Sequence, residues 1–240
     1  MSRSLAPMLC LLALALAACG DDDSGSSDAA KGDGAATTKT DADAGTAGDV
    51  SAGLQCGTVK QPEPKPDGGA KRPTEELDTN AAYDVVLKTS CGDITIRLDQ
   101  KTSPKTAASF AALAKSGFFD ATVFHRIVPA FVIQGGDPTA TGTGGPGYFT
   151  RDAPPKDTAY TKGTVAMAKT QTEPAGTAGS QFYIVTAPDA GLPPEYAVRG
   201  MVVEGLEVVN AIGELGDPAS GDLGTPLQPV VIERAALRES

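Results

Sequence analysis

The 240-residue sequence is poor in the residues that many functional sites need: it has no tryptophan, one histidine and four cysteines. A metal site built from several imidazoles, or a zinc finger with two histidines and two cysteines, is therefore excluded. Cationic residues are also in the minority, with 20 Lys and Arg against 30 Asp and Glu, a formal net charge of −10. Because nucleic-acid binding needs a clustered cationic surface, no nucleic-acid partner is expected.

The start of the chain has the layout of a secretory signal peptide, with the basic Arg3 followed by an apolar run from Leu5 to Leu16. The run is too short for a transmembrane helix, which takes about 20 apolar residues. Its end, Leu16-Ala17-Ala18-Cys19, resembles the bacterial lipobox, in which the signal is cleaved before a cysteine whose thiol is lipidated. We therefore expect a signal peptide over 1–18, a lipid anchor on Cys19 and a protein exported to the extracytoplasmic side of a cell membrane. An ordinary signal peptide with an incidental cysteine is the alternative.

Residues 20–53 have the composition of a disordered tether. Val50 is their only large aliphatic residue, they contain no aromatic residue, and their eight Asp and two Lys give −6 of the net charge. Such a segment cannot bury enough apolar surface to offset the entropy of ordering the chain. Residues 61–73 then contain four prolines, which favour a stiff, extended linker. We expect a disordered acidic and Pro-rich tether over 19–80 and a globular domain over 81–240.

The globular part reads mainly as short strands. Apolar residues alternate with polar ones at 83–87 and 94–98, on either side of a turn, which predicts a hairpin. A helix is expected from Ser103, its cap, to Gly117, and a second over 205–212. Further apolar runs predict strands at 123–128, 131–134, 164–168, 181–186, 197–203 and 230–232. About eight strands result, and closure into a barrel would protect their edges.

The densest run of unusual residues lies between Phe124 and Asp137 and reads Phe-His-Arg-Ile-Val-Pro-Ala-Phe-Val-Ile-Gln-Gly-Gly-Asp. An arginine among large apolar residues is costly unless its charge has a role or a partner. Together with the later segments Gly-Thr-Gly-Gly, Ala166-Met167-Ala168 and Gly-Ser-Gln-Phe-Tyr-Ile, the run resembles cyclophilin-type peptidyl-prolyl cis-trans isomerases over residues 81–235. The resemblance implies a mainly β fold, an eight-stranded closed antiparallel β-barrel capped by two α-helices.

The same resemblance implies the site residues. It places the family's catalytic arginine at Arg126 and the contacts with the substrate backbone at Gln134 and Gln181. The proline-binding pocket falls on Phe131, Val132, Ala168, Tyr183 and Leu192.

Isomerisation of an X-Pro bond explains why so few groups are needed. Twisting the bond breaks amide conjugation, a barrier of roughly 18–20 kcal/mol, and leaves a lone pair on the prolyl nitrogen. The permanently charged guanidinium of Arg126 can donate to this lone pair and so stabilise the twisted form more than the planar one. An apolar pocket holds the ring while Gln134 anchors the neighbouring backbone, so that one side of the bond is fixed and the other turns. No cofactor or metal is required, and proline-containing polypeptides are the expected partners.

Several positions depart from the family or invite other interpretations. Arg199 stands where the family usually has phenylalanine, and Gly191 stands where many members have tryptophan. Residues 142–147 match the GxGxxG dinucleotide pattern, but no helix follows them, so a surface loop near the active face is expected. His125 alternates to the strand face opposite Arg126 and is expected to be structural.

Two cysteines remain once Cys10 is removed with the signal and Cys19 is lipidated. In an exported protein, Cys56 and Cys91 are therefore the one pair that can form a disulfide, which would fasten the end of the tether to the first hairpin. Two free thiols are the alternative.

The leading hypothesis is a monomeric isomerase that accelerates the folding of exported proteins. The alternative from another class is a holdase, a chaperone that binds proline segments with little turnover. A solute-binding lipoprotein fits poorly, because the chain is too short for two lobes with a cleft between them.

Overall fold

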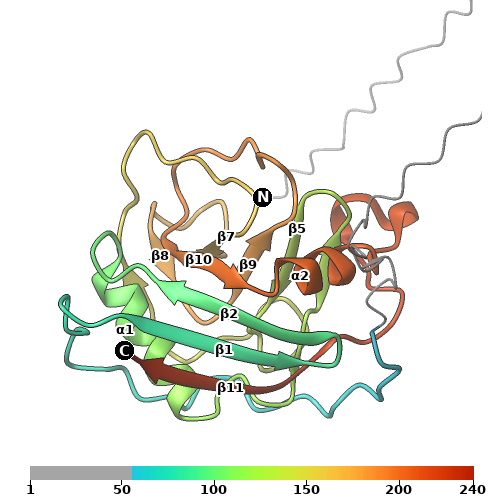
Figure 1. The fold of residues 1–240 in the computed structure, drawn as a ribbon, viewed down its shortest axis with the longest axis horizontal. Helices are drawn as coiled ribbons and strands as arrows, with labels where there is room; N and C mark the ends of the chain where they lie inside the picture. The colour runs from blue at the N-terminus through green and yellow to red at the C-terminus, as the bar shows by residue number, and fades with distance from the viewer. Residues whose placement is uncertain (1–55) are drawn as a thin grey trace, which may run out of the picture. The chain divides into compact units, whose positions relative to one another are not determined.

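One curled antiparallel sheet of nine strands forms the body of the protein in the computed structural model, which describes residues 56–240 (Figure 1). In pairing order, the strands are β3 (Thr122–Val123), β11 (Val231–Glu239), β1 (Tyr83–Thr89), β2 (Gly92–Leu98), β10 (Val198–Glu204), β7 (Thr164–Met167), β9 (Phe182–Val185), β5 (Val132–Gly135) and β4 (Arg126–Val128). A separate two-stranded sheet pairs β6 (Thr150–Arg151) with β8 (Thr177–Ala178). The predicted signal peptide, the proposed lipid site at Cys19 and the acidic segment 20–53 lie outside the described residues.

The mainly β class is confirmed, but the prediction of a closed eight-stranded barrel is wrong in detail. The sheet has nine strands, and β3 and β4 at its two ends are not paired with each other. The apolar run 123–128, predicted as one strand, is broken between these two strands. The amide of Phe124 donates to the carbonyl of Val230, whereas the amide of Ile127 donates to the carbonyl of Gly224. Because the two halves of the run bond to different segments, the run cannot continue as one strand.

The two predicted α-helices are present as α1 (Pro104–Lys115) and α2 (Leu206–Gly213), and they lie at opposite ends of the curled sheet in Figure 1. Ser103 occupies the N-cap position of α1, as predicted, although its hydroxyl makes no capping hydrogen bond. A 3-10 helix, η1 (Pro218–Leu223), precedes β11. None of the helices among residues 56–240 is long and apolar enough to cross a membrane.

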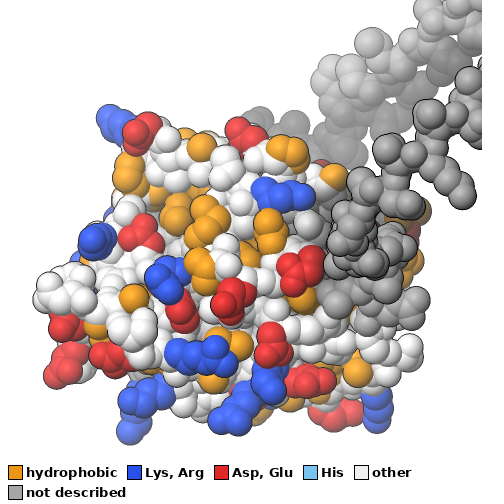
Figure 2. Space-filling view, in the orientation of Figure 1, with side chains coloured by type: hydrophobic (Ala, Val, Ile, Leu, Met, Phe, Trp, Pro, Cys, Tyr) orange, Lys and Arg blue, Asp and Glu red, His pale blue; other side chains and the backbone are white. Residues whose placement is uncertain are grey.

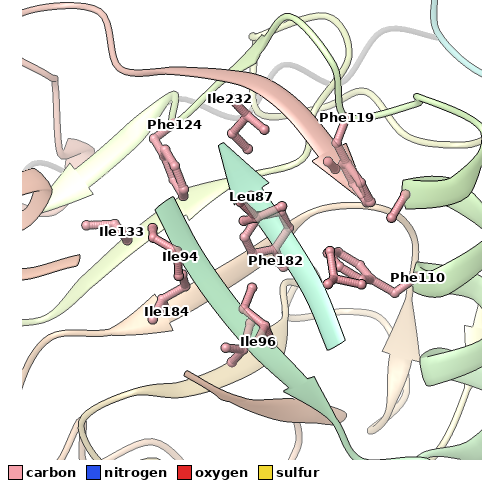
Figure 3. Close-up of a cluster of buried hydrophobic side chains, with 14 of the residues drawn as sticks. Leu87, Ile94, Ile96, Phe110, Phe119, Phe124, Ile133, Phe182, Ile184 and Ile232 are labelled. Carbon is pink, nitrogen blue, oxygen red and sulfur yellow. The ribbon is translucent and has the colours of Figure 1, made fainter. Parts of the chain in front are cut away.

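The core fills the inside of the curled sheet. The side chains labelled in Figure 3 come from strands, helix α1 and loops: Leu87, Ile94, Ile96, Phe110, Phe119, Phe124, Ile133, Phe182, Ile184 and Ile232. The rings of Phe110 and Phe182 meet edge to face with centroids 5.4 Å apart, a favourable arrangement for aromatic pairs. Charged side chains of both signs are interspersed on the face shown in Figure 2.

Arg199 is inside this core. The pairing of β10 with β7 shifts register between Val198 and Gly200, so Arg199 sits at an irregularity in the ladder. Its side chain is fully buried, and the guanidinium carbon lies 3.2 Å from the ring centroid of Phe110 and 5.0 Å from that of Phe182. None of its three guanidinium nitrogens has a hydrogen-bond partner in the described part of the chain.

Residues 56–70, which we call the N-terminal strap, run along the domain without helix or strand (Figure 1, blue to cyan). Cys56 is joined to Cys91 by a disulfide, and the amide of Gly57 donates to the carbonyl of Ser90 at 2.9 Å. The ammonium group of Lys65 donates to the carbonyls of Phe118 and Asp120, at 2.6 and 2.9 Å, just beyond the end of α1. Residues 56–70 lie within the segment expected to be a disordered tether, and backbone and side-chain groups of the domain bind them.

Candidate active site

The side chains of Arg126, Gln134 and Tyr183 form a row across three neighbouring strands. Arg126 on β4 is paired in register with Gln134 on β5, and Gln134 is paired with Tyr183 on β9. The residues that alternate with them, such as Ile133 and Ile184, point into the core. Because strand side chains alternate between faces, the row lies on the outer face of the curled sheet.

A chain of hydrogen bonds connects this row to the glycine-rich loop. Arg126 Nη1 donates to Gln134 Oε1 at 3.3 Å, and Gln134 Nε2 donates to Gln181 Oε1 at 3.1 Å. Gln181 Nε2 in turn donates to the carbonyl of Gly144 at 2.9 Å. The structure thus brings together all three polar residues that the sequence implicates.

The guanidinium of Arg126 is held from the other side by η1. Arg126 Nε donates to the carbonyl of Asp222 at 3.0 Å, and Nη2 makes no hydrogen bond with any described residue. Burial lowers the pKa of Arg126, and the charge of Asp222 raises it. Since the ordinary pKa of arginine lies far above neutrality, the group stays cationic and keeps donors for a ligand.

A small cavity of about 200 Å³ opens beside Arg126. Seven of the residues implicated by sequence line it: Arg126, Phe131, Val132, Gln134, Ala168, Tyr183 and Leu192. Two further lining residues, Lys169 and Tyr196, were not predicted as site residues. The buried hydroxyl of Tyr183 has no hydrogen-bond partner in residues 56–240, and burial raises its pKa. The cavity thus has an apolar side at Phe131, Val132, Ala168 and Leu192 and a polar side at Arg126 and Gln134.

A large cavity of about 530 Å³ adjoins the small one and shares Gln134, Ala168 and Lys169 with it. The remaining implicated residue, Gln181, lines this cavity rather than the small one. Its other walls are the strap residue Asp67, residues 142–149, and the segments 170–173 and 177–180, from which Thr170, Glu173, Thr177, Gly179 and Ser180 contribute. The GxGxxG segment is therefore a loop at the site, as predicted.

Asp137 organises this glycine-rich loop, a role that the sequence did not reveal. Its fully buried carboxylate accepts hydrogen bonds from the amides of Thr139, Gly142 and Gly144, at 2.7, 2.6 and 3.2 Å. Burial alone would raise the pKa of Asp137, but these hydrogen bonds outweigh it, and the pKa lies below its ordinary value. Position 144 favours glycine, because a Cβ there would collide with Asp137 Oδ1 and with the side chain of Thr139.

Two side chains near the site, Lys169 and Asp67, had weak or absent sequence signals. Lys169 follows the recognisable Ala166-Met167-Ala168 segment, but nothing in the pattern indicates that its side chain turns into both cavities. Asp67 belongs to the segment predicted as tether. His125 lines a third cavity, of about 290 Å³, together with residues 225–229 and not with Arg126. Both of its ring nitrogens lack partners in the described structure, and burial lowers its pKa.

Residues 56–240 contain no group of three or more His, Cys, Asp and Glu side chains placed to hold a metal ion. The chemistry that the site offers comes from the cation of Arg126, two amide side chains and a cavity with an apolar side. Such an arrangement can bind a polypeptide segment and donate a hydrogen bond to it.

Comparison with known proteins agrees with this geometry. The family model described as "Cyclophilin type peptidyl-prolyl cis-trans isomerase/CLD" matches residues 84–237. The chain is 38% identical over 189 residues to the probable peptidyl-prolyl cis-trans isomerase B of Mycobacterium leprae, covering 72% of this chain and 61% of that protein. It is 39% identical over 155 residues to the peptidyl-prolyl cis-trans isomerase ppi1 of Schizosaccharomyces pombe, covering 63% of this chain and 96% of that protein.

Solved structures give the same result. A cyclophilin-type peptidyl-prolyl cis-trans isomerase of Cryptosporidium parvum superposes with a TM-score of 0.59 at 31% identity, covering 65% of this chain and 98% of that one. A second structure of a C. parvum isomerase, determined in the presence of the dipeptide Ala-Pro, gives a TM-score of 0.58 at 32% identity. The protein thus belongs to the cyclophilin-type peptidyl-prolyl cis-trans isomerases, a family of enzymes.

Proposed function

We propose that this protein accelerates cis–trans isomerisation of X-Pro bonds in exported polypeptides while they fold. The observation that carries the proposal is that Arg126, in register with Gln134, lines the small cavity together with Phe131, Val132 and Leu192. The proline ring enters the small cavity against Val132 and Tyr183. Uncatalysed isomerisation takes tens to hundreds of seconds, which is slow enough to limit folding.

The catalytic step is a rotation and needs no bond-breaking chemistry. Gln134 anchors the substrate backbone on one side of the bond, and Arg126 donates a hydrogen bond to the prolyl nitrogen as it becomes pyramidal. The planar amide nitrogen has no such lone pair, so the hydrogen bond is stronger in the twisted state. The contacts of Arg126 with Asp222 and Gln134 preorient the guanidinium before the substrate arrives.

The proposal includes the location of the enzyme. Lipidation at Cys19, after cleavage of residues 1–18, anchors the protein to the extracytoplasmic side of a cell membrane. There the enzyme, a monomer whose catalytic domain is held at the membrane, meets newly exported chains.

The test compares Arg126→Ala with the matched control Arg234→Ala, which removes an exposed arginine on β11. Loss of one preorganised donor should lower kcat/KM for a short X-Pro peptide by about 30- to 1000-fold, whereas the control should match wild type. Unchanged turnover in Arg126→Ala would refute the assigned role.

An aggregation-suppression assay on the same two variants addresses the holdase alternative. Protection of an unfolded client without measurable turnover by wild type would favour the holdase over the enzyme. Turnover that depends on Arg126 would favour the enzyme.

A further inference from the structure

The large cavity has a wall that comes from outside the matched family region. Asp67, on the N-terminal strap, lines this cavity together with the glycine-rich loop, whereas the family match begins at residue 84. The cavity shares three lining residues with the small cavity in which we place the proline ring. A side chain of the same substrate, close to the proline, can therefore enter the large cavity, one wall of which carries Asp67.

Direct hydrogen bonds hold Asp67 at the cavity. The amide of Gly145 donates to Asp67 Oδ1 at 2.8 Å, and the amide of Gly68 donates to the carbonyl of Gly145 at 2.9 Å. The amide of Ala70 adds a bond to the carbonyl of Pro146 at 3.1 Å. These bonds fix the strap against the loop, so the carboxylate has a defined place in the wall.

The charges on the cavity wall favour one sign of ligand. Three charged residues line it: Asp67, Lys169 and Glu173. The ammonium group of Lys169 lies 3.0 Å from Glu195 Oε2 and also donates to the carbonyls of Thr170 and Glu173, and its side chain is 1% exposed. Its charge is thus already compensated within the protein. Of the charged residues that line the cavity, this leaves the carboxylates of Asp67 and Glu173 without an ion-pair partner in the described part of the chain.

We propose that the large cavity selects substrates with a lysine or arginine side chain near the proline. This inference rests on the proposed isomerase function and names its substrate class. The apolar stem of such a side chain can lie on Pro146 and on the ring of Phe149, which is 61% exposed. Its cationic end then approaches Asp67 and Glu173, while an acidic side chain would be repelled.

Short peptides with a single proline test this selection. Lys, Gln or Glu is placed one or two residues from the proline, on either side, with alanine elsewhere. Each peptide is measured in an isomerisation assay and in a binding titration by fluorescence anisotropy. At the position that reaches the cavity, wild type should prefer Lys over Glu by about three- to tenfold, and added salt should reduce the preference.

Asp67→Asn separates charge from structure, because the asparagine carbonyl can still accept the hydrogen bond from Gly145. This variant should reduce the Lys-to-Glu ratio by about two- to fivefold. The control Glu63→Gln removes a carboxylate from an exposed position on the same strap that does not line the cavity, and its ratio should equal that of wild type.

The outcomes distinguish this inference from the proposed function. Equal binding of the Lys and Glu peptides to wild type, or an unchanged ratio in Asp67→Asn, overturns the inference even if turnover is high. If binding depends on the charge of the peptide and Asp67→Asn weakens this dependence, the inference is supported. This holds even where no peptide is turned over and the isomerase proposal itself fails.

Discussion

At the residue scale, the guanidinium of Arg199 is a charged group whose burial is costly. It is fully buried on the faces of Phe110 and Phe182, without a hydrogen-bond partner, and burial lowers its pKa well below the usual value. A cation over aromatic rings gains some energy, but an unpaired buried charge costs more. The aromatic contacts offset only part of the cost.

We therefore predict that Arg199→Met stabilises the protein. Methionine retains the length of the side chain and removes the charge, and the free energy of unfolding should rise by about 1–4 kcal/mol. Urea denaturation of wild type and variant provides the measurement, with Arg234→Met on the exposed side of β11 as the control. A lower unfolding midpoint in Arg199→Met would show that the guanidinium is a net stabilising group.

Asp137 leads to a prediction about acid stability. Because the pKa of its carboxyl is lower in the folded chain than its ordinary value, the folded state binds the proton less readily than the unfolded state. The stabilisation is present above the unfolded-state pKa of about 3.9 and is lost as the pH falls through it towards the folded pKa.

Asp137→Asn removes this titration and also places an amide group against backbone N–H donors. We expect the variant to lose at least about 2 kcal/mol of stability at neutral pH and to show a flatter decline below about pH 4. Unfolding midpoints measured from neutral to acidic pH test both parts. The exposed Asp157→Asn serves as control and should follow wild type.

At the element scale, the N-terminal strap is an addition to the sheet, held by one covalent bond and several hydrogen bonds. The disulfide between Cys56 and Cys91 closes a loop with a sequence separation of 35. Closing a loop of this size restricts the unfolded chain and so favours the folded one.

Replacing both cysteines, as Cys56→Ser with Cys91→Ser, should lower the free energy of unfolding by about 2–4 kcal/mol. Wild type treated with a reductant should shift to the same unfolding midpoint, while the double variant should not respond. Two titratable thiols in unreduced wild type, or identical midpoints in all samples, would contradict the bond.

Elements with local sequence signals were predicted, whereas a strand break that depends on distant residues was not. Alternating apolar residues predicted the hairpin of β1 and β2, and the proline after Ser103 predicted the start of α1, because these signals are local. The break between β3 and β4 was missed, since it depends on backbone bonds to Val230 and Gly224, about one hundred residues further along the chain.

The site likewise contains residues that the sequence indicated and residues that it did not. A family motif indicated Arg126, Gln134 and the apolar residues of the small cavity, and the structure places them together. Lys169 and Asp67 could not be found, because the fold of distant segments brings their side chains to the cavities. The inward position of Arg199 coincides with a register shift between β10 and β7, which no short-range pattern in the sequence predicts.

At the scale of the whole molecule, the proposed anchor joins the catalytic domain to a membrane through Cys19. Cys19→Ala should abolish lipidation, and the protein should move from the membrane fraction to the soluble exported fraction, since no other acyl chain would then hold it. Fractionation with mass spectrometry of the N-terminal peptide gives the readout. A variant that stays in the membrane fraction would show that something other than this cysteine retains the protein.

The position of the disulfide has a mechanical consequence for such an anchored enzyme. Cys56 lies at the N-terminal end of the strap, and its covalent bond leads to the turn between β1 and β2. Any tension that arrives from the preceding chain passes through this bond into the nine-stranded sheet. The disulfide thus lies between the preceding chain and the hydrogen bonds of Asp67 and Gly68, so tension meets a covalent bond to the sheet before it meets the contacts at the large cavity.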